Sequence, residues 1–236
     1  MDTLFLVRIF AYSLLPLLLA AGHMMLDRQV QTPARRIELV IIYVLAISVG
    51  ANGLSGAFGH LFLSDLVAEG VGWASGSPFQ LEMGFANLLV GVLGLMAVSR
   101  RDGFRTAAIL ATTILGFGAT TVHLLDIAAT GNLAPGNTIQ NLGNLLDPVL
   151  LIGLTWLATR IADPDSESPA FLRWQMGQQP IVGLAAAGIG TGFGIGFAVG
   201  GMLLWTLLGA LAGVGLGVWI SRQGAHRQPD PLADGR

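Results

Sequence analysis

The chain has 236 residues, of which 53% are hydrophobic and only 11% are charged, and its mean hydropathy is +0.68. Soluble globular domains carry about 25% charged residues, so the composition excludes an ordinary water-soluble protein. There is no Cys, which excludes disulfides, thiol nucleophiles and thiolate metal sites. The formal net charge is −2 and the arginines are not concentrated in one segment, which argues against nucleic-acid binding. The partner that the composition predicts is the lipid bilayer.

Seven stretches are long and apolar enough to cross a bilayer as helices. A membrane helix needs about 20 apolar residues to span roughly 30 Å of hydrocarbon. We therefore predict an all-α integral membrane protein with seven transmembrane helices joined by short polar connections. The expected spans are Leu4 to Met25, Ile37 to Leu63, Phe79 to Ser99, Thr106 to Ala129, Leu142 to Ala162, Ile181 to Gly200 and Met202 to Ser221.

Arginine occurs in alternate connections only. It follows the first, third, fifth and seventh predicted spans and is absent from the connections after the second, fourth and sixth. Short loops rich in Arg stay in the cytoplasm. The N-terminus is therefore expected outside and the C-terminus in the cytoplasm, as in a multi-pass protein of the cytoplasmic membrane.

The last two predicted spans are rich in glycine. Four-residue spacing places these glycines on one face of each helix, where the missing Cβ lets two helices approach closely. We predict a glycine-zipper hairpin that packs against itself, against a second copy in a homo-oligomer, or against another membrane protein. The glycines of this pattern are Gly188, Gly192, Gly196, Gly200, Gly209, Gly213 and Gly217.

These features divide the chain into four predicted parts. Residues 1–163 form a five-helix membrane core, residues 164–180 a cytoplasmic loop, residues 181–221 the glycine-rich hairpin, and residues 222–236 a disordered cytoplasmic tail. Nearly all polar residues inside apolar stretches belong to the core. Because such residues usually mark functional sites in membrane proteins, the site is expected there.

Ionisable residues of the core gather at one predicted membrane level. His60 lies near the outer end of the second span, Glu82 in the first turns of the third, and His123 with Asp126 at the outer end of the fourth. Intramembrane charges usually face the bundle interior, and residues three apart share a helix face. We predict an outer-facing pocket in which these four side chains bind one divalent metal (Zn, Fe or Mn) or carry protons. Secondary members of this site are Asp65, Asn87, Asn132, Asn137 and Asp147.

Several of these residues also have a structural interpretation. Glu82 follows Ser77-Pro78-Phe79-Gln80, a pattern typical of a helix start in which Ser is the N-cap and Gln completes a capping box. Asp147-Pro148 likewise resembles an N-cap followed by a first-turn proline. Either histidine could be satisfied by water or by a carbonyl group at the interface. Arg8, inside the first span, either reaches the outer surface or pairs with one of the acids.

Two motifs of the core carry a resemblance. They are GSPFQLEMGFANL at residues 76–88 and GNLAPGN at residues 131–137, together with Gly59-His60 and the segment from His123 to Asp126. In these residues the chain resembles an uncharacterised family of small bacterial multi-pass membrane proteins with the motifs GSPFQxExGFANL and GNxAPGN. The resemblance covers about residues 37–160 and implies a bacterial inner-membrane location. The family has no known activity that could be transferred to this chain. The glycine-rich hairpin looks like an addition to that core.

Seven helices with an outside N-terminus also resemble the membrane hydrolases of the ceramidase and adiponectin-receptor type, which hold zinc with three histidines. The chain lacks the third membrane histidine and the His-x-x-x-His pair of the last helix, so enzymatic activity stays open. Two alternatives to a metal or proton site remain. One is a proton-coupled small-solute transporter or channel, and the other is a non-catalytic accessory or assembly subunit that docks through the glycine-rich hairpin.

Overall fold

The computed structural model describes residues 2–29, 32–161 and 169–227. Within these residues the secondary structure is helical, and no strand occurs. Seven helical runs are long and apolar enough to cross a membrane, which confirms the predicted helical class and the number of spans. The runs are Phe5–Leu26, Pro33–Phe62, Phe79–Ala97, Gly103–Thr130, Pro135–Arg160, Gly177–Val199 and Met202–Gln223.

Each of the first two spans contains a π-helical segment between two α-helical parts. The first span consists of α1 (Asp2–Ile9), η1 (Phe10–Leu14) and α2 (Leu15–Leu26). A π-helical turn takes in an extra residue and shifts the helix faces on either side of it. The second span consists of α3 (Pro33–Tyr43), η2 (Val44–Ala51) and α4 (Asn52–Phe62). The remaining helices are α5 (Ser64–Val71), α6 (Phe79–Ala97), α7 (Gly103–Thr130), α8 (Pro135–Thr138), α9 (Gln140–Arg160), α10 (Pro169–Val199) and α11 (Met202–Arg227).

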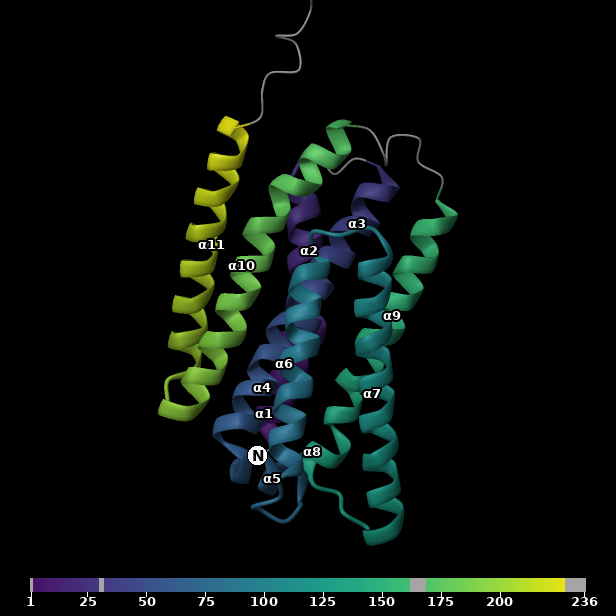
Figure 1. Cartoon of the computed structure of the whole chain (residues 1–236), viewed down its shortest axis with the longest axis vertical. Helices are drawn as coiled ribbons and strands as arrows, with labels where there is room; N and C mark the ends of the chain where they lie inside the picture. Colours follow the sequence, from purple (N-terminus) through teal and green to yellow (C-terminus); the bar gives the residue numbers. More distant parts are fainter. Residues whose placement is uncertain (1, 30–31, 162–168, 228–236) are drawn as a thin grey trace, which may run out of the picture.

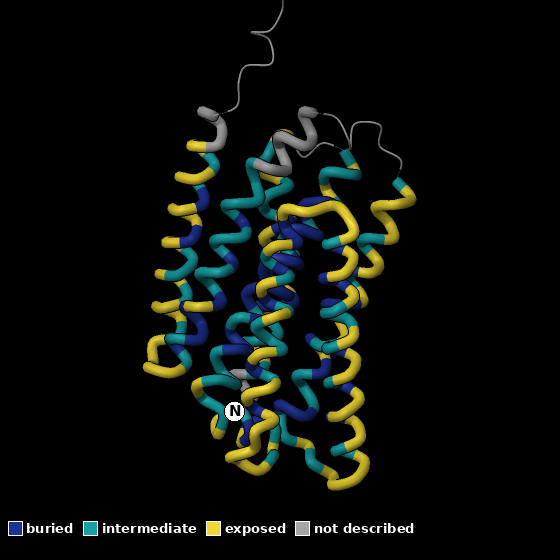
Figure 2. Tube along the Cα trace, viewed as in Figure 1, coloured by how far each residue is buried: buried dark blue, intermediate teal, exposed yellow. Residues whose placement is uncertain are grey.

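The second span is the centre of the bundle. Every residue of η2 is buried, and the hydrophobic core is built around it with residues from α3, α6, α7, α9 and α10. Figure 2 shows the buried residues gathered in the middle of the bundle, while α7, α9 and α11 carry long exposed runs. The exposed side chains of these helices are largely leucine, isoleucine, valine and tryptophan, which suits contact with lipid.

Small residues let α4 and α6 cross in direct backbone contact. A Cβ placed on Gly53 would lie 2.5 Å from Cα of Gly91, and one on Gly56 would lie 2.8 Å from Oδ1 of Asn87. Real Cβ atoms do not approach other atoms this closely, so Gly53 requires glycine unless the helices move apart, whereas a Cβ at Gly56 would displace the side chain of Asn87. The close crossing brings the amide of Asn87 onto the surface of α4.

The hairpin of α10 and α11 lies along one side of the core (Figure 1). It turns at Gly200 and Gly201, whose φ angles are 83° and 76°, a region that favours glycine. A Cβ on Gly188 would lie 2.0 Å from the carbonyl oxygen of Gly209, so the two helices meet in backbone contact at this level. α10 also packs against η2 and α4, whereas α11 packs on α10.

Among the described residues, the arginines other than Arg8 lie at one end of the bundle. The ends of α2, α9 and α11 and the connection between α6 and α7 lie at one end, which we call the arginine end (Figure 1). The N-terminus, α5 and α8 lie at the other end, which we call the acidic end. Its acids are Asp65, Glu69, Glu82 and Asp126. The first and last described residues therefore lie at opposite ends of the bundle, as an odd number of spans requires.

α7 begins earlier than predicted because Asp102 caps it. The Asp102 carboxylate accepts a hydrogen bond from the backbone N–H of Phe104 at 3.0 Å, as N-cap aspartates do. Arg105, which was expected in a connection, therefore lies in the first turn of the helix. It is 6% exposed, and its two terminal nitrogens donate to the Glu38 carboxylate of α3 at 2.9 Å each.

The two hairpin helices are also longer than predicted. α10 begins at Pro169, so most of the predicted loop 164–180 is helical, and residues 162–168 lie outside the described residues. α11 continues to Arg227. The rest of the predicted tail, residues 228–236, likewise lies outside the described residues.

Candidate functional site

A cavity of about 470 Å³ lies inside the bundle of the first five spans. Its walls come from α1, η2 and α4 to α9, with a short contribution from α10. Most of the lining surface is apolar, and polar side chains point in from several helices. Volumes of about 300–1,000 Å³ with such a lining are typical of small-molecule sites. The polar side chains include Arg8, Asn52, Ser55, His60, Gln80, Asn87, Thr112, His123, Gln140, Asn144 and Asp147.

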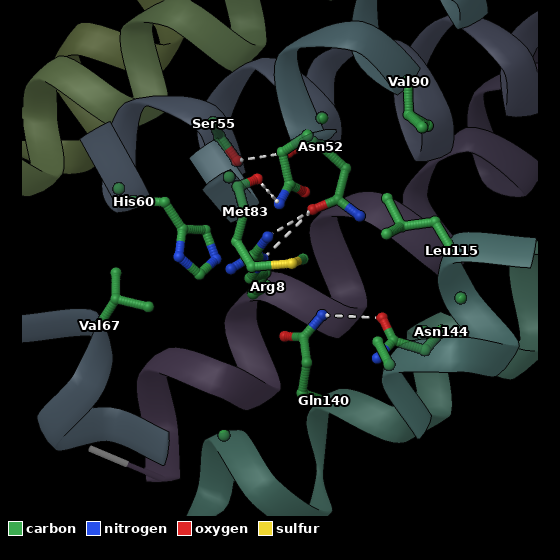
Figure 3. Close-up of a pocket in the computed structure, with 18 of the residues that line it drawn as sticks. Arg8, Asn52, Ser55, His60, Val67, Met83, Val90, Leu115, Gln140 and Asn144 are labelled. Carbon is green, nitrogen blue, oxygen red and sulfur yellow. Dashed lines mark hydrogen bonds between the residues drawn. The ribbon is translucent and has the colours of Figure 1, made fainter. Parts of the chain in front are cut away.

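Arg8 of α1 reaches into this cavity (Figure 3). Its Nε and Nη2 donate to Oδ1 of Asn52 at 3.2 and 2.9 Å. A Cβ on Gly56 would lie 3.4 Å from Nη2, so the glycine leaves room for the guanidinium. No carboxylate in the described part of the chain forms an ion pair with Arg8. Both sequence interpretations of Arg8 are therefore wrong, because a neutral amide holds it inside the bundle.

His60, near the end of α4, pairs with an amide. Its Nδ1 lies 2.7 Å from Oε1 of Gln80, and Gln80 is 2% exposed. With the amide oxygen in this position, Nδ1 is the donor of this hydrogen bond. The capping-box role predicted for Gln80 is wrong, because its side chain turns inward to the histidine. At the start of α6, Oγ of Ser77 accepts a hydrogen bond from the backbone N–H of Phe79 at 3.3 Å.

Further amides complete the polar part of the cavity. Nδ2 of Asn87 donates to the carbonyl oxygen of Met83, one turn earlier on α6, at 2.8 Å. On α9, Nε2 of Gln140 donates to Oδ1 of Asn144 at 3.4 Å (Figure 3). Oε1 of Gln140 is buried and has no hydrogen-bond partner among the described residues. The site thus combines the Arg8 guanidinium with several neutral donors and acceptors and with the carboxyl group of Asp147.

Asp126 of α7 joins three segments at the acidic end. Its Oδ2 accepts hydrogen bonds of 2.9 Å from Nε1 of Trp73, Nδ2 of Asn132 and Nδ2 of Asn137. These donors come from the connection after α5, the connection after α7, and α8. Hydrogen bonds to an ionised acceptor are stronger than neutral ones, so this carboxylate acts as the centre of a structural network.

His123 belongs to the same network. Its Nδ1 lies 2.7 Å from Oδ1 of Asn137, a residue with 0% exposure. The His123 ring stacks on that of Trp73 with the ring centroids 5.3 Å apart. Asn137 therefore connects the histidine to Asp126, and it anchors the segment from Gly131 to Asn137 against α7.

The structure distributes the four principal predicted residues over three surroundings. His123 and Asp126 share the network at the acidic end, and His123 also lines the cavity in which His60 lies beside Gln80. Glu82 is exposed on α6. Among the residues that the structure describes, no group of three His, Asp or Glu is close enough to hold a metal ion. Both histidines bond to amide oxygens, where carboxylates were expected. The divalent-metal hypothesis stays a prediction.

Of the two remaining predicted acids, Asp65 lies apart from these groups and Asp147 lines the cavity from α9. Asp65 is exposed and accepts a hydrogen bond from the backbone of the next connection at 3.3 Å. Asp147 is 5% exposed and lies inside α9, so its predicted N-cap role is wrong. Pro148 cannot donate to the carbonyl oxygen of Asn144. Gly116 of α7 packs against that oxygen, since a Cβ on Gly116 would lie 2.4 Å from it.

Sequence reasoning missed the residues that give the cavity its chemistry. Arg8 was interpreted as a surface anchor or an acid partner, and neither Asn52 nor Gln80 was considered as a site residue. A lone charge in one apolar span and a lone amide in the next are a usable signal, because each must find a partner inside the membrane.

Seven apolar helices of bilayer length around a partly polar cavity define a multi-span α-helical membrane protein. The chain belongs to the family of unknown function DUF6790, whose model matches residues 7–164. This agrees with the predicted membership of an uncharacterised family. The match covers the first five spans and the polar cavity residues named above, whereas α10 and α11 lie beyond it. No curated protein and no solved structure matches the chain.

Proposed function

We propose that the chain binds a small molecule inside the membrane, in the cavity of its first five spans. Arg8 is the observation that carries this proposal. Its guanidinium lies in an internal cavity of about 470 Å³ without a carboxylate partner in the described ranges. A charge in such a position is costly unless it is paired or serves a ligand. Gln140, Asn144 and His60 add hydrogen-bonding groups around the same space (Figure 3).

We also propose that the arginine end faces the cytoplasm. The positive-inside rule supports this orientation, because the connections with arginine are short and lie together. The acidic end, α5 and α8 would then face outward, and the cavity would lie in the outer half of the bilayer. The expected location is the bacterial cytoplasmic membrane.

Transport through the same site is the alternative function, as a proton-coupled carrier or a channel. The packing on the arginine side of the cavity favours binding. On that side, one hydrophobic cluster of buried side chains fills the bundle. It includes Ile41, Leu45, Ala108, Ile109 and Leu151. A transporter must open this cluster, whereas a binding protein leaves it closed.

Occupation of the cavity is testable before the ligand is known. Purified protein is stripped of bulk lipid in mild detergent, and native mass spectrometry detects molecules that remain bound. Ala119→Phe fills the cavity from α7, and Ala129→Phe on the exposed surface of the same helix is the matched control. We expect wild type and Ala129→Phe to retain a bound molecule and Ala119→Phe to lose it. Equal retention in all three proteins, or retention in none, would contradict the proposal.

The divalent-metal hypothesis has a separate test. Elemental analysis of purified wild type and of His60→Ala measures bound Zn, Fe and Mn. Stoichiometric metal that is lost in the variant would support a metal site at His60. The absence of metal from both proteins would remove that hypothesis and leave the small-molecule proposal untouched.

We propose, finally, that the glycine rows of the hairpin act within the chain. The backbone contact between Gly188 and Gly209 supports this. An accessory subunit that docks through the hairpin would have to use the outer surface of α11, where Leu203, Leu207 and Leu211 are 74%, 52% and 69% exposed. A partner that co-purifies with wild type and is lost on Leu207→Ser would favour docking through this surface.

A further inference from the structure

The hydrogen-bonding capacity of Arg8 is not filled by the protein. Nε and Nη2 share a single acceptor, Oδ1 of Asn52, and Nη1 donates to no group in the described part of the chain. A guanidinium presents its N–H donors as a rigid fork that matches two oxygens of a carboxylate or a phosphate. Because Arg8 lines the cavity, a carboxylate or a phosphate in the cavity could accept hydrogen bonds from the donors that Asn52 leaves unused.

The space around this cation is mostly hydrocarbon. Apolar side chains line it from four different elements, and they include Phe5, Val67, Met83, Val90 and Leu115. Burial of apolar surface is favourable in proportion to the area removed from water, so a small hydrated anion alone would leave these walls unfilled. The lining therefore suits a ligand with a charged group at one end and an apolar body.

The cavity opens through the side of the bundle, between α6 and α7. Ile114, Gly118 and Val122 form a row on α7, and all three line the cavity while being exposed on the surface of the bundle. Ile114 is 65% exposed and Val122 is 49% exposed. On α6, Phe79 also lines the cavity and is 39% exposed. Both helices are membrane spans, so this opening faces lipid.

The charge at the acidic end disfavours entry of a soluble anion from that side. Asp65, Glu69 and Glu82 are exposed there, and Asp126 adds a fourth carboxylate. Among the described residues, Arg8 is the only arginine toward this end of the bundle. A surface of one sign lowers the local concentration of ions of the same sign. An anion that approaches within the bilayer avoids this surface.

We propose that the cavity takes an anionic amphiphile from the bilayer, with its carboxylate or phosphate group against Arg8 and its hydrocarbon chain along α6 and α7. This inference rests on the proposed function, because it names the class of molecule that the cavity binds. A lipid and a soluble carboxylate or phosphate share the same charged group. The opening toward lipid and the acidic end both favour the lipid as the source.

The test uses two probes with the same chain, one with a charged head group and one with a neutral head group. They are a medium-chain fatty acid and the matching fatty alcohol, each with the same diazirine on its chain, added to protein in nanodiscs of zwitterionic phosphatidylcholine. After illumination, mass spectrometry maps the labelled residues. We expect the acid to label cavity residues such as Met83 and Leu115 about tenfold more than the alcohol does, the size that hydrogen bonds to a charged group typically supply. An unlabelled alkyl phosphate should compete, and acetate or inorganic phosphate should not.

Variants of the cation separate its charge from its structural role. Asn52→Asp places a carboxylate where Oδ1 now lies, 2.9 and 3.2 Å from two guanidinium nitrogens. It should therefore occupy Arg8 and lower labelling by the acid about tenfold without loss of stability. Arg8→Gln should lower the same labelling, and Arg8→Lys should restore part of it, because lysine keeps the charge but not the fork. Labelling by the alcohol should stay at the wild-type level in all three, which shows that the cavity is intact.

A second pair of variants tests the route of entry. Gly118→Trp places a large side chain at the opening, and Gly153→Trp on the exposed face of α9 is its control, since a Cβ at either glycine meets nothing within 4 Å. We expect labelling to fall only in Gly118→Trp. Equal labelling in the two variants would overturn the lateral route.

The remaining outcomes separate this inference from the proposed function. Equal labelling by acid and alcohol in wild type, unchanged by Asn52→Asp, would overturn the anionic class and leave a cavity that binds neutral molecules. Absence of cavity labelling by either probe would overturn both proposals. Competition by acetate or inorganic phosphate as strong as that by the alkyl phosphate would overturn the lipid source and assign a soluble anion.

Discussion

Two arginines in the interior of this chain have opposite electrostatic surroundings. Arg105 donates to both carboxylate oxygens of Glu38 at 2.9 Å, and Nε of Arg101 lies 3.7 Å from the same carboxylate. Arg8 has the amide of Asn52 as its acceptor. A carboxylate neutralises a buried guanidinium and an amide does not. The charge of Arg105 is therefore neutralised by Glu38, whereas the charge of Arg8 is not neutralised by Asn52.

Replacing only one member of the Glu38–Arg105 pair should destabilise the arginine end more than replacing both. Arg105→Met leaves the Glu38 carboxylate, which is 4% exposed, with the more exposed Arg101 as its cation. We expect a loss of about 3 kcal/mol in the free energy of unfolding, as for other broken buried pairs. The double variant with Glu38→Met should recover most of it. Denaturant unfolding in detergent measures both, and a double variant as unstable as Arg105→Met would refute this account.

Asp126→Asn should loosen the acidic end. The change puts an amide N–H₂ where three N–H donors already converge, so at least one donor loses its acceptor, at a cost of about 1–3 kcal/mol. Hydrogen–deuterium exchange should become faster at residues 72–76 and 131–138, the segments that supply those donors. Exchange within η2 is the internal control and should not change. Unaltered protection of both segments would show that Asp126 does not hold them.

At the scale of single elements, apolar length predicts where each span lies but not how its faces are turned. The π-helical segments η1 and η2 each add a residue to a turn, and one residue corresponds to a rotation of about 100°. Asn52 follows η2 directly, so its direction toward Arg8 depends on that rotation. The eight residues of η2 are an apolar run in which nothing marks a π turn.

The sequence predicts where each candidate site residue lies along its helix, but not which way its side chain points around the helix. The members of the site therefore could not be grouped from the sequence. Counting residues from the ends of the predicted spans brings His60, Glu82 and His123 to similar levels. Position around each helix depends on packing partners. His60 hydrogen-bonds to the amide of Gln80 and His123 to the amide of Asn137, because packing places each amide oxygen next to a ring nitrogen. Glu82 is exposed on the surface of α6.

The hairpin offers a matched test of close packing between elements. Gly188→Leu should force α10 away from α11, because a Cβ there meets the backbone of Gly209. Overpacking of this kind costs about 1–3 kcal/mol. Gly215→Leu on α11 is the control, since its Cβ meets nothing within 4 Å, and its effect should stay within about 0.5 kcal/mol. Thermal unfolding in detergent compares the two, and equal stabilities would contradict the role of Gly188.

For the whole molecule, the segregation of charge predicts the direction of insertion. The chain has no Cys, so single cysteines can report which side of a membrane they face. Ser77 lies in the connection after α5 and Ser99 in the connection after α6, and both are exposed. In a bacterial inner membrane, Ser77→Cys should react with an impermeant maleimide in intact cells. Ser99→Cys should react only after permeabilisation, and the reverse pattern would invert the topology.

Pro148 lacks a backbone N–H, so one hydrogen bond is missing inside α9. This position separates two parts of the helix. The part before the proline carries Gln140, Asn144 and Asp147, which line the cavity, and the part after it carries Leu151, which is fixed in the core. Helices bend readily at proline, so this residue is the place where the first part could tilt. For the amphiphile that we propose, such a tilt would make room for chains of different length or branching, while the headgroup stays at the same arginine.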